Sequence, residues 1–247
     1  MLTHPLRGKS ALVTGGAQRI GRGIALALAR AGADVAITYR NSSEAAVQTT
    51  RQMEALGCRA LAVECDVRSE ASVRAAVAAT IGGFGRLDVL VNNAALFSFA
   101  RIENLSLEAW DEVFETNARG PFLVAREVLA HLRATGGRIV NIGSLGGIHG
   151  WPDHAHYCAS KAALHMLTQS MAKAFAPGVS VNCVAPGWIE LEDNAARDEK
   201  EAERFAGKTP MSRNGTVDDV AQAVLFFAAG PSFITGQIMV VDGGLGL

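Results

Sequence analysis

The chain has 247 residues, a formal net charge of −1, 49% hydrophobic residues and 26 glycines. This composition is typical of a globular protein with a buried core and many tight turns, and it excludes a disordered or fibrous chain. The near-zero charge, without a run of five like charges, argues against a nucleic-acid-binding surface, so the expected partners are small molecules. We expect a single α/β domain over residues 1–247.

The first ten residues lack the apolar core of a secretory signal, and no later stretch is long and apolar enough to span a bilayer. The four cysteines form no C-x-x-C pair. Neither they nor the six histidines, which we expect at the surface or at a pocket rim, have metal-ligand spacing. The sequence therefore predicts a cytoplasmic protein with reduced cysteines, no metal site and no membrane partner.

Short β-branched apolar runs alternate along the chain with longer alanine-rich helical stretches. This alternation is the signature of βαβ units, and strands buried on both faces explain the continuous apolar runs. Right-handed crossovers then predict a doubly wound parallel sheet of about seven strands with helices on both faces. The predicted strands are 11–14, 35–39, 60–64, 89–92, 138–142, 179–184 and 237–241, and the predicted helices are 21–31, 43–56, 69–81, 107–134, 156–175 and 217–228.

A polar run extends from Glu190 to Lys208 between two apolar elements. It is compatible with a solvated helical face and with a mobile lid over a pocket. We expect residues 188–210 to form a mobile substrate-binding loop or helix.

A glycine-rich turn, Thr-Gly-Gly-Ala-Gln-Arg-Ile-Gly, occupies residues 14–21 and opens into the first helix. Glycines let a backbone approach a pyrophosphate closely, and a helix N-terminus supplies free N–H groups and partial positive charge. A plain strand-to-helix turn is the alternative, but the position between strand and helix favours nucleotide binding. The expected contacts from this turn are Gly15, Arg19, Ile20 and Gly21.

The end of the second strand distinguishes NAD from NADP. A carboxylate there suits the free 2′-hydroxyl of NAD, whereas arginine suits the 2′-phosphate of NADP. Here the strand ends in Tyr39, Arg40, Asn41 and Ser42, without an acid, and Arg19 supplies a second cation. NADP(H) is the predicted cofactor, although Arg40 could also be an ordinary exposed neighbour of a helix cap.

Candidate catalytic residues follow the fifth strand. Ser144 comes two residues after it, and Tyr157 and Lys161 lie four apart on the next helix, on one face. A nearby ammonium favours phenolate and is expected to lower the pKa of a tyrosine by ~1 to 3 units, which would make it a usable general acid.

Taken together, the sequence resembles the short-chain dehydrogenase/reductase family over nearly its whole length. The motifs that carry the resemblance appear in the family's order. They are residues 14–21, Asp66-Val67, Asn92-Asn93-Ala94, Asn117, Ser144, Tyr157 with Lys161, Pro186-Gly187, and Asp242-Gly243-Gly244.

The resemblance implies a Rossmann fold and a set of roles. Ser144 would hold the substrate oxygen, Tyr157 would supply the proton, and Lys161 would hold the nicotinamide ribose. Asn117 would hold water in a proton relay to Lys161. Asp66 would hold the adenine edge, and Asn92 would support the fourth strand and the cofactor. Further cofactor contacts are expected from Val67, Asn93, Ala94, Pro186, Gly187 and Ile189. The family commonly forms homotetramers or homodimers through its long helices.

Two residues depart from the family pattern. Arg19 stands where glycine is usual, and Leu191 stands where a threonine often contacts the carboxamide. Arg19 and Phe97 resemble the pteridine reductase branch, whose members tend to have aspartate in place of Ser144. Phe97 and Trp188 are candidate substrate-binding residues, and Phe97 could equally be a wall for any apolar substrate.

Three functions remain open from the sequence. The leading one is NADP-dependent reduction of a carbonyl, such as a 3-oxoacyl thioester or a related ketone. The second is a pteridine or dihydropteridine reductase, and the third is a catalytically silent NADP-sensing protein. The presence of all four candidate catalytic residues favours an enzyme.

Overall fold

The computed structural model describes residues 4–191 and 199–247. Within these residues, seven parallel strands form a sheet in the order β3-β2-β1-β4-β5-β6-β7. The strands are β1 (Ser10–Val13), β2 (Asp34–Tyr39), β3 (Ala60–Glu64), β4 (Val89–Asn92), β5 (Arg138–Ile142), β6 (Ser180–Pro186) and β7 (Ile238–Val241). The doubly wound sheet expected from the sequence is confirmed.

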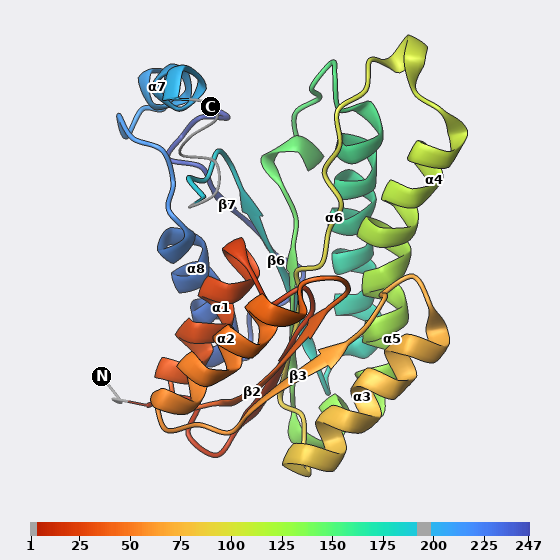
Figure 1. Cartoon of the computed structure of the whole chain (residues 1–247), viewed down its shortest axis with the longest axis vertical. Coiled ribbons are helices and arrows are strands. Elements are labelled where there is room, and N and C mark those ends of the chain that lie inside the picture. The colour runs from red at the N-terminus through yellow and green to blue at the C-terminus, as the bar shows by residue number, and fades with distance from the viewer. Residues whose placement is uncertain (1–3, 192–198) are drawn as a thin grey trace.

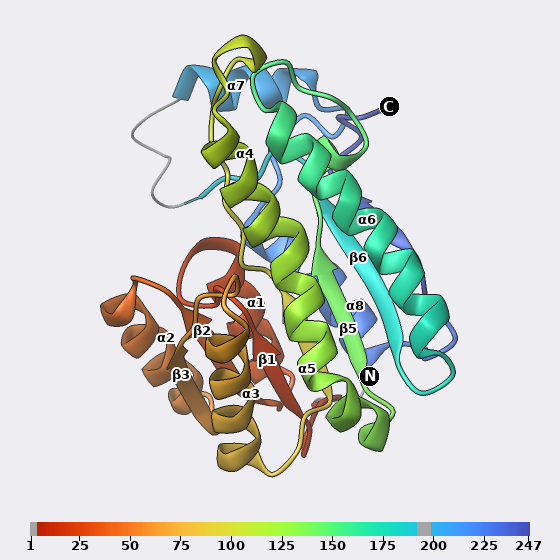
Figure 2. The ribbon, with the colours of Figure 1, turned by 90° about the vertical axis from the view of Figure 1, so that its right-hand side faces the viewer.

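Helices cover both faces of this sheet. Figure 1 shows α1, α2 and α8 on one side and α3, α4, α5 and α6 on the other, and Figure 2 shows α4 and α5 running end to end beside α6. The helices are α1 (Arg19–Arg30), α2 (Ser43–Ala55), α3 (Glu70–Phe84), α4 (Leu107–Phe114), α5 (Gly120–Thr135), α6 (Ala155–Phe175), α7 (Glu199–Lys208) and α8 (Val217–Ala229).

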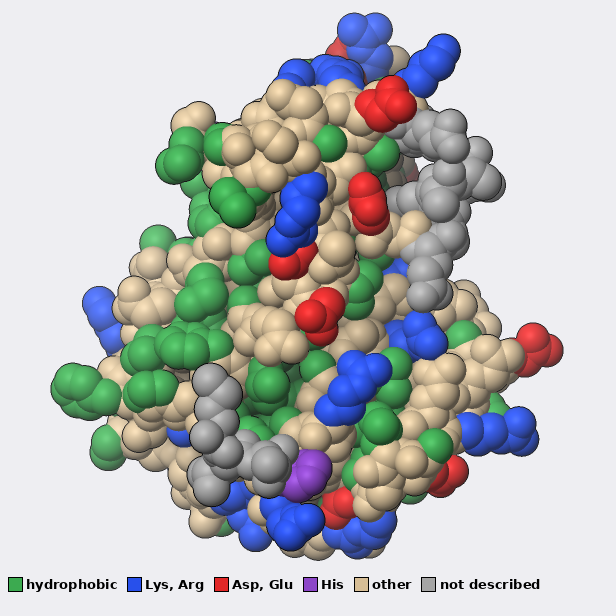
Figure 3. Space-filling view, turned by 90° about the vertical axis from the view of Figure 1, so that its left-hand side faces the viewer, with side chains coloured by type: hydrophobic (Ala, Val, Ile, Leu, Met, Phe, Trp, Pro, Cys, Tyr) green, Lys and Arg blue, Asp and Glu red, His purple; other side chains and the backbone are tan. Residues whose placement is uncertain are grey.

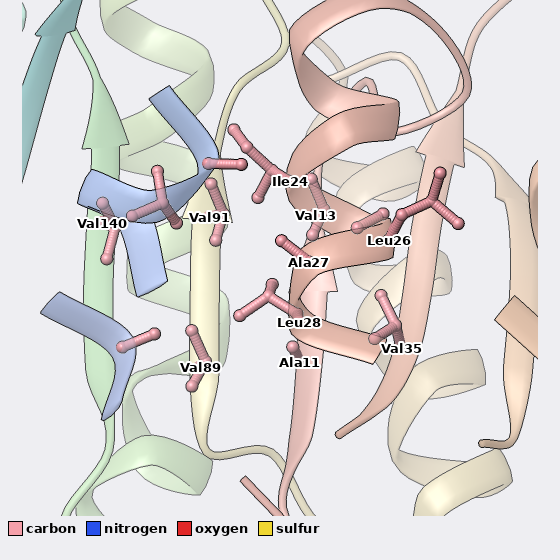
Figure 4. Packing of buried hydrophobic residues seen from close by; sticks show 14 of the residues in the cluster. Ala11, Val13, Ile24, Leu26, Ala27, Leu28, Val35, Val89, Val91 and Val140 are labelled. Atoms are coloured by element: carbon pink, nitrogen blue, oxygen red, sulfur yellow. The ribbon is translucent and has the colours of Figure 1, made fainter. Parts of the chain in front are cut away.

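The sheet's centre is buried because both of its faces are covered. Every residue of β1 and β4 is buried, as the continuous apolar runs predict. Ile24 and Leu28 of α1 are 0% and 1% exposed, and Figure 4 shows them lying against Val13, Val89 and neighbouring strand residues. Each such side chain contributes roughly 1.5–3 kcal/mol to the free energy of folding when fully buried, so this packing stabilises the position of α1 on the sheet.

The strand order reverses between β1 and β4. β1 pairs with β2 on one side and with β4 on the other, so the connections after these strands diverge. A crevice forms at such a point, beyond the carboxyl ends of the strands. The glycine-rich turn and the loops after β4, β5 and β6 all end there.

The predicted helix 107–134 is wrong in one respect, because a π-helical turn at Glu115–Arg119 separates α4 from α5. In this turn the Gly120 N–H bonds to Glu115 O, five residues earlier. Pro121 has no N–H, so the Asn117 carbonyl lacks its α-helical donor. The proline explains why the helix widens here.

The proposed lid falls partly outside the described residues, namely at 192–198. Residues Glu199–Lys208 form α7, and the ring of its Phe205 stacks on Trp188 at 4.2 Å. No helix in the described ranges is both long enough and apolar enough to cross a membrane.

Candidate active site

An open cleft of about 1660 Å³ lies at the carboxyl ends of the central strands. Of the described site residues predicted from the sequence, all but Asn117 line this cleft. They are Gly15, Arg19, Ile20, Gly21, Tyr39, Arg40, Asn41, Ser42, Asp66, Val67, Asn93, Ala94, Phe97, Ser144, Tyr157, Lys161, Pro186, Gly187, Trp188 and Ile189.

Gly15 and Gly21 of the glycine-rich turn cannot be replaced by residues that carry a Cβ. Gly15 has a φ of +62°, and a Cβ on it would lie 3.0 Å from the Ala94 Cα. A Cβ on Gly21 would lie 2.2 Å from the Gly15 carbonyl oxygen. The turn can therefore approach a ligand with its backbone, and α1 begins directly behind it at Arg19.

Thr14 and Asn93 tie this turn to the loop after β4. The Asn93 side-chain amide donates to the carbonyl oxygens of Thr14 and Gly15 at 2.9 and 3.0 Å. In return the Thr14 hydroxyl accepts from the backbone N–H groups of Asn93 and Ala94, both at 3.0 Å. Thr14 is the first residue of the glycine-rich turn, but its position in the sequence does not predict this role. Asn92 does not line the cleft, and its side-chain amide donates to the Asn141 side chain of the neighbouring strand β5 at 2.9 Å.

At the end of β2, Arg40 lies on the cleft wall with its side chain 44% exposed. Asp66 also lines the cleft, and its carboxylate accepts hydrogen bonds from the Arg68 guanidinium. These hydrogen bonds hold the pKa of the Asp66 carboxyl below its usual value, with a smaller contribution from the charge of Arg40. Since β2 ends without an acid, Arg40 is the charged group that its end presents to a ligand.

Ser144, Tyr157 and Lys161 converge on the same part of the cleft. Ser144 caps the short 3-10 turn Leu145–Gly147 after β5, accepting from the Gly146 N–H at 3.0 Å, and hydrogen-bonds the Tyr157 phenol. Tyr157 and Lys161 are one turn apart on α6. The Lys161 ammonium donates to the Ile142 carbonyl at 2.8 Å and lies 5.8 Å from the centroid of the Tyr157 ring.

The expected lowering of the Tyr157 pKa is wrong for this arrangement. Burial raises the pKa of Tyr157 to about 12, opposed by the hydrogen bond from Ser144. Burial also lowers the pKa of Lys161 to about 8. The Lys161 ammonium is hydrogen-bonded to a backbone carbonyl and does not contact the Tyr157 phenol closely. Desolvation of Tyr157, which raises its pKa, therefore outweighs the effect of the ammonium charge, which would lower it.

Asn117 lies in the π-helical turn and is fully buried. Its side-chain oxygen accepts from the Leu96 N–H at 2.8 Å, and its amide donates to the Leu96 carbonyl at 2.9 Å and to Ser160 Oγ at 3.0 Å. Ser160 in turn donates to the Tyr157 carbonyl at 2.7 Å. Asn117 thus links the loop after β4 to the helix that carries Tyr157.

Aromatic rings form the end of the cleft beyond Tyr157. Phe97 is 59% exposed, and its ring meets Tyr157 edge-on at 4.8 Å while stacking on His154 at 4.5 Å. The Trp151 ring stacks near Tyr157 at 6.2 Å. The candidate substrate residues Phe97 and Trp188 both line the cleft, Phe97 beside Tyr157 and Trp188 against Phe205 of α7.

Two histidines contradict the expected surface or rim positions. His156 is 0% exposed and shares a 2.7 Å hydrogen bond with Ser98, and His165 is 5% exposed. The signal for His165 was available: it follows Lys161 by four residues, which places both on one face of α6.

Comparison with known proteins finds relatives that are described as reductases or dehydrogenases. A family model described as enoyl-(acyl carrier protein) reductase matches residues 15–246. A 3-oxoacyl-[acyl-carrier-protein] reductase of Staphylococcus aureus is 37% identical over 96% of this chain and 98% of its own length. Among solved structures, a dehydrogenase/reductase from Sinorhizobium meliloti has a TM-score of 0.93 and 39% identity, covering 99% of this chain and 98% of its own. A short chain dehydrogenase from Burkholderia cenocepacia, in complex with NADP, has a TM-score of 0.92 and 39% identity, covering 98% and 100%.

These matches span almost the entire chain at well over 30% identity. They agree with the order of the motifs and with the sheet topology. The chain belongs to the short-chain dehydrogenase/reductase family of oxidoreductases.

Proposed function

We propose that this chain is an NADPH-dependent reductase that converts a ketone to an alcohol, with Tyr157 as the general acid. The observation that carries the proposal is the hydrogen-bonded pair of Ser144 and Tyr157, with Lys161 one turn away, in a cleft that also contains the glycine-rich turn. NADPH supplies the hydride when bound, and the Burkholderia cenocepacia relative is in complex with NADP.

The residues of the cleft fit a dinucleotide phosphate. Gly15 and Gly21 have no side chain, so the backbone of the turn can approach a pyrophosphate at the start of α1. Arg40 and Arg19 both line the cleft and are suited to a 2′-phosphate. Asp66 and the neighbouring Val67 would hold the adenine.

The proton chemistry follows from the positions of the side chains. Ser144 donates to the substrate carbonyl oxygen as negative charge develops on it. Tyr157, with a pKa raised to about 12, keeps its proton at neutral pH and gives it up only to a strong base such as the developing alkoxide. The Lys161 ammonium stabilises the phenolate that is left.

We assign the reprotonation of Tyr157 to a relay through Lys161 and a water held by Asn117. The Asn117 side chain already has three partners, so its backbone carbonyl, which lacks an α-helical donor, is the group suited to hold a relay water. The assignment explains why an interrupted helix lies behind the site.

The proposed substrate is a 3-oxoacyl thioester or a related ketone, in keeping with the name of the Staphylococcus aureus relative and with the apolar wall around Phe97. The test is NADPH oxidation, with NADH as the control, against an acetoacetyl thioester, simple ketones and aldehydes, and a quinone. Turnover of carbonyls with NADPH preferred supports the proposal, and the absence of turnover with all of them overturns it.

Dihydropteridine reduction is the second candidate, favoured by the exposed ring of Phe97 beside Tyr157. A flat bicyclic substrate could stack on this ring. Dihydrobiopterin is therefore included in the panel. Turnover confined to this compound, and lost in Phe97→Ala, would favour the second candidate over the first.

The setting of the reaction is proposed to be the cytoplasm, with a small-molecule substrate and a homotetrameric or homodimeric enzyme. Three of the four cysteines are buried, and a reducing compartment would keep them as small apolar core residues.

A further inference from the structure

His165 occupies a position behind the Ser144 loop that the proposed reaction does not use. It is 5% exposed and does not line the cleft. Its Nε2 accepts from the Ser144 backbone N–H at 3.4 Å, and its ring also hydrogen-bonds the Gly147 backbone. Since Nε2 is the acceptor, Nδ1 carries the proton and donates to the Gly147 carbonyl. One ring therefore spans the loop that carries Ser144.

The loop is shaped around this ring. A Cβ added to Gly143 would lie 2.2 Å from His165 Nε2, and one added to Gly147 would lie 2.6 Å from Cε1. Gly143 and Gly147 do not have a positive φ, so their backbone conformation does not by itself require glycine. The space that the imidazole occupies is sufficient to explain why both positions are glycine.

The ring's two hydrogen bonds require the neutral form, which has one donor and one acceptor. Burial, and then the charge of Lys161, lower the pKa of His165 to about 4. At neutral pH the imidazole therefore matches the two backbone groups that face it.

We infer that His165 is a positioning residue that fixes the backbone of Ser144 relative to α6, the helix that carries Tyr157 and Lys161. It acts through Ser144 and touches neither substrate nor cofactor. The inference rests on the proposed function, because it needs Ser144 to act on the substrate oxygen.

The test is a double-mutant cycle in kcat, measured with NADPH and the best carbonyl of the panel. His165→Leu is expected to lower kcat by about ten-fold or more and to leave the KM for NADPH unchanged, because small misplacements of a catalytic group cost up to about 10²-fold. His165→Gln, whose side-chain oxygen can replace Nε2 as acceptor, is expected to recover most of the loss. In a Ser144→Ala background, His165→Leu should change the residual kcat by less than about two-fold, because the group it positions is gone.

Thr168→Val provides a matched control on the same buried face of α6. Thr168 accepts from Asn141 and donates to the Leu164 carbonyl, both at 2.8 Å, and neither partner belongs to the Ser144 loop, so its replacement should lower the unfolding midpoint without lowering kcat. The inference is overturned if His165→Leu reduces kcat by the same factor with and without Ser144, or if His165→Gln is no better than His165→Leu while both bind NADPH. A Ser144→Ala enzyme with full activity would instead overturn the role proposed for Ser144, which separates the two failures.

Discussion

The charge of Lys161 depends on its surroundings. The side chain is 2% exposed, and its ammonium donates to the carbonyl of Ile142. In the described part of the chain no carboxylate forms a salt bridge with it, so burial dominates and lowers its pKa to about 8. Tyr157, with its pKa raised to about 12, stays protonated well above that pH.

The pH dependence of kcat follows from this difference. A group with a lowered pKa loses its proton as the pH rises through that pKa, so the Lys161 charge is present below pH of about 8 and lost above it. We expect kcat for carbonyl reduction to fall as the pH rises past that value. The measurement is kcat at saturating NADPH over a pH range of about 6 to 10, which extends to both sides of the lowered pKa of Lys161.

Lys161→Met is the control for this profile, because it should be slow across the whole range. A wild-type kcat that is level through pH of about 8, or a Lys161→Met enzyme with the same fall, would rule out Lys161 as the titrating group.

Arg40 carries the prediction on cofactor choice. Arg40→Ser removes the cation at the end of β2, so kcat/KM for NADPH should fall about 10- to 100-fold, as expected for a charged hydrogen bond worth about 1.5–3 kcal/mol. The value for NADH should change little. Arg74, whose side chain is 63% exposed on α3 outside the cleft, offers a control in Arg74→Ser. Equal losses with NADPH and NADH would show that Arg40 does not read the 2′-phosphate.

At the scale of elements, the π-helical turn joins two parts of the site. Pro121 removes a helical donor, and the wider turn places the Asn117 amide against the Leu96 backbone and Ser160. The loop after β4 and α6 are therefore connected through one buried side chain. This connection is a structural role in addition to the relay proposed for the Asn117 carbonyl.

Asn117→Ala should destabilise the fold measurably. It removes two hydrogen bonds to the half-buried backbone of Leu96 and one to the buried Ser160 hydroxyl. Each lost hydrogen bond costs about 0.5–1.5 kcal/mol, so we expect a loss of about 3 kcal/mol in the free energy of unfolding. Urea titration checks this, with an unchanged slope as the sign that the folded state stays compact. A loss below about 1 kcal/mol would mean that water or backbone movement replaces these bonds.

The sequence predicted most of the elements because their signals are local. β-branched runs gave the bounds of β3, β4 and β5 as the structure has them, and the glycine motif placed the cofactor end. The π-helical turn was missed because helical periodicity does not register one extra residue, although Pro121 was a signal. The pKa of Tyr157 was predicted with the wrong sign because desolvation depends on burial, which spacing along a helix does not reveal.

At the scale of the whole molecule, apolar side chains stay exposed on both helical layers. Leu107, Phe122 and Met166, on α4, α5 and α6, are 77%, 42% and 61% exposed. On the opposite side, hydrophobic side chains also gather at the surface (Figure 3), and Phe226 of α8 is 44% exposed. Association through α4, α5 and α6 would bury the exposed apolar side chains of these helices, and the expected assembly through the long helices rests on this burial.

The assembly prediction is tested by sedimentation velocity. The wild-type chain should sediment as a dimer or tetramer, and the pair Phe122→Glu and Met166→Glu should yield a smaller species, because a buried charge opposes association. Glu substitution at Val47, 46% exposed on α2, serves as a comparison outside the long helices. A monomeric wild-type protein at micromolar concentration would contradict the prediction.

The central claim is that Tyr157 supplies the proton for an NADPH-dependent carbonyl reduction. The most direct measurement is NADPH oxidation by the wild-type protein and by Tyr157→Phe against the carbonyl panel. The account predicts turnover by the wild type and a kcat lower by about 10²- to 10⁴-fold in Tyr157→Phe, the range that general acid catalysis contributes, with NADPH binding retained. Equal turnover by the two proteins would contradict it.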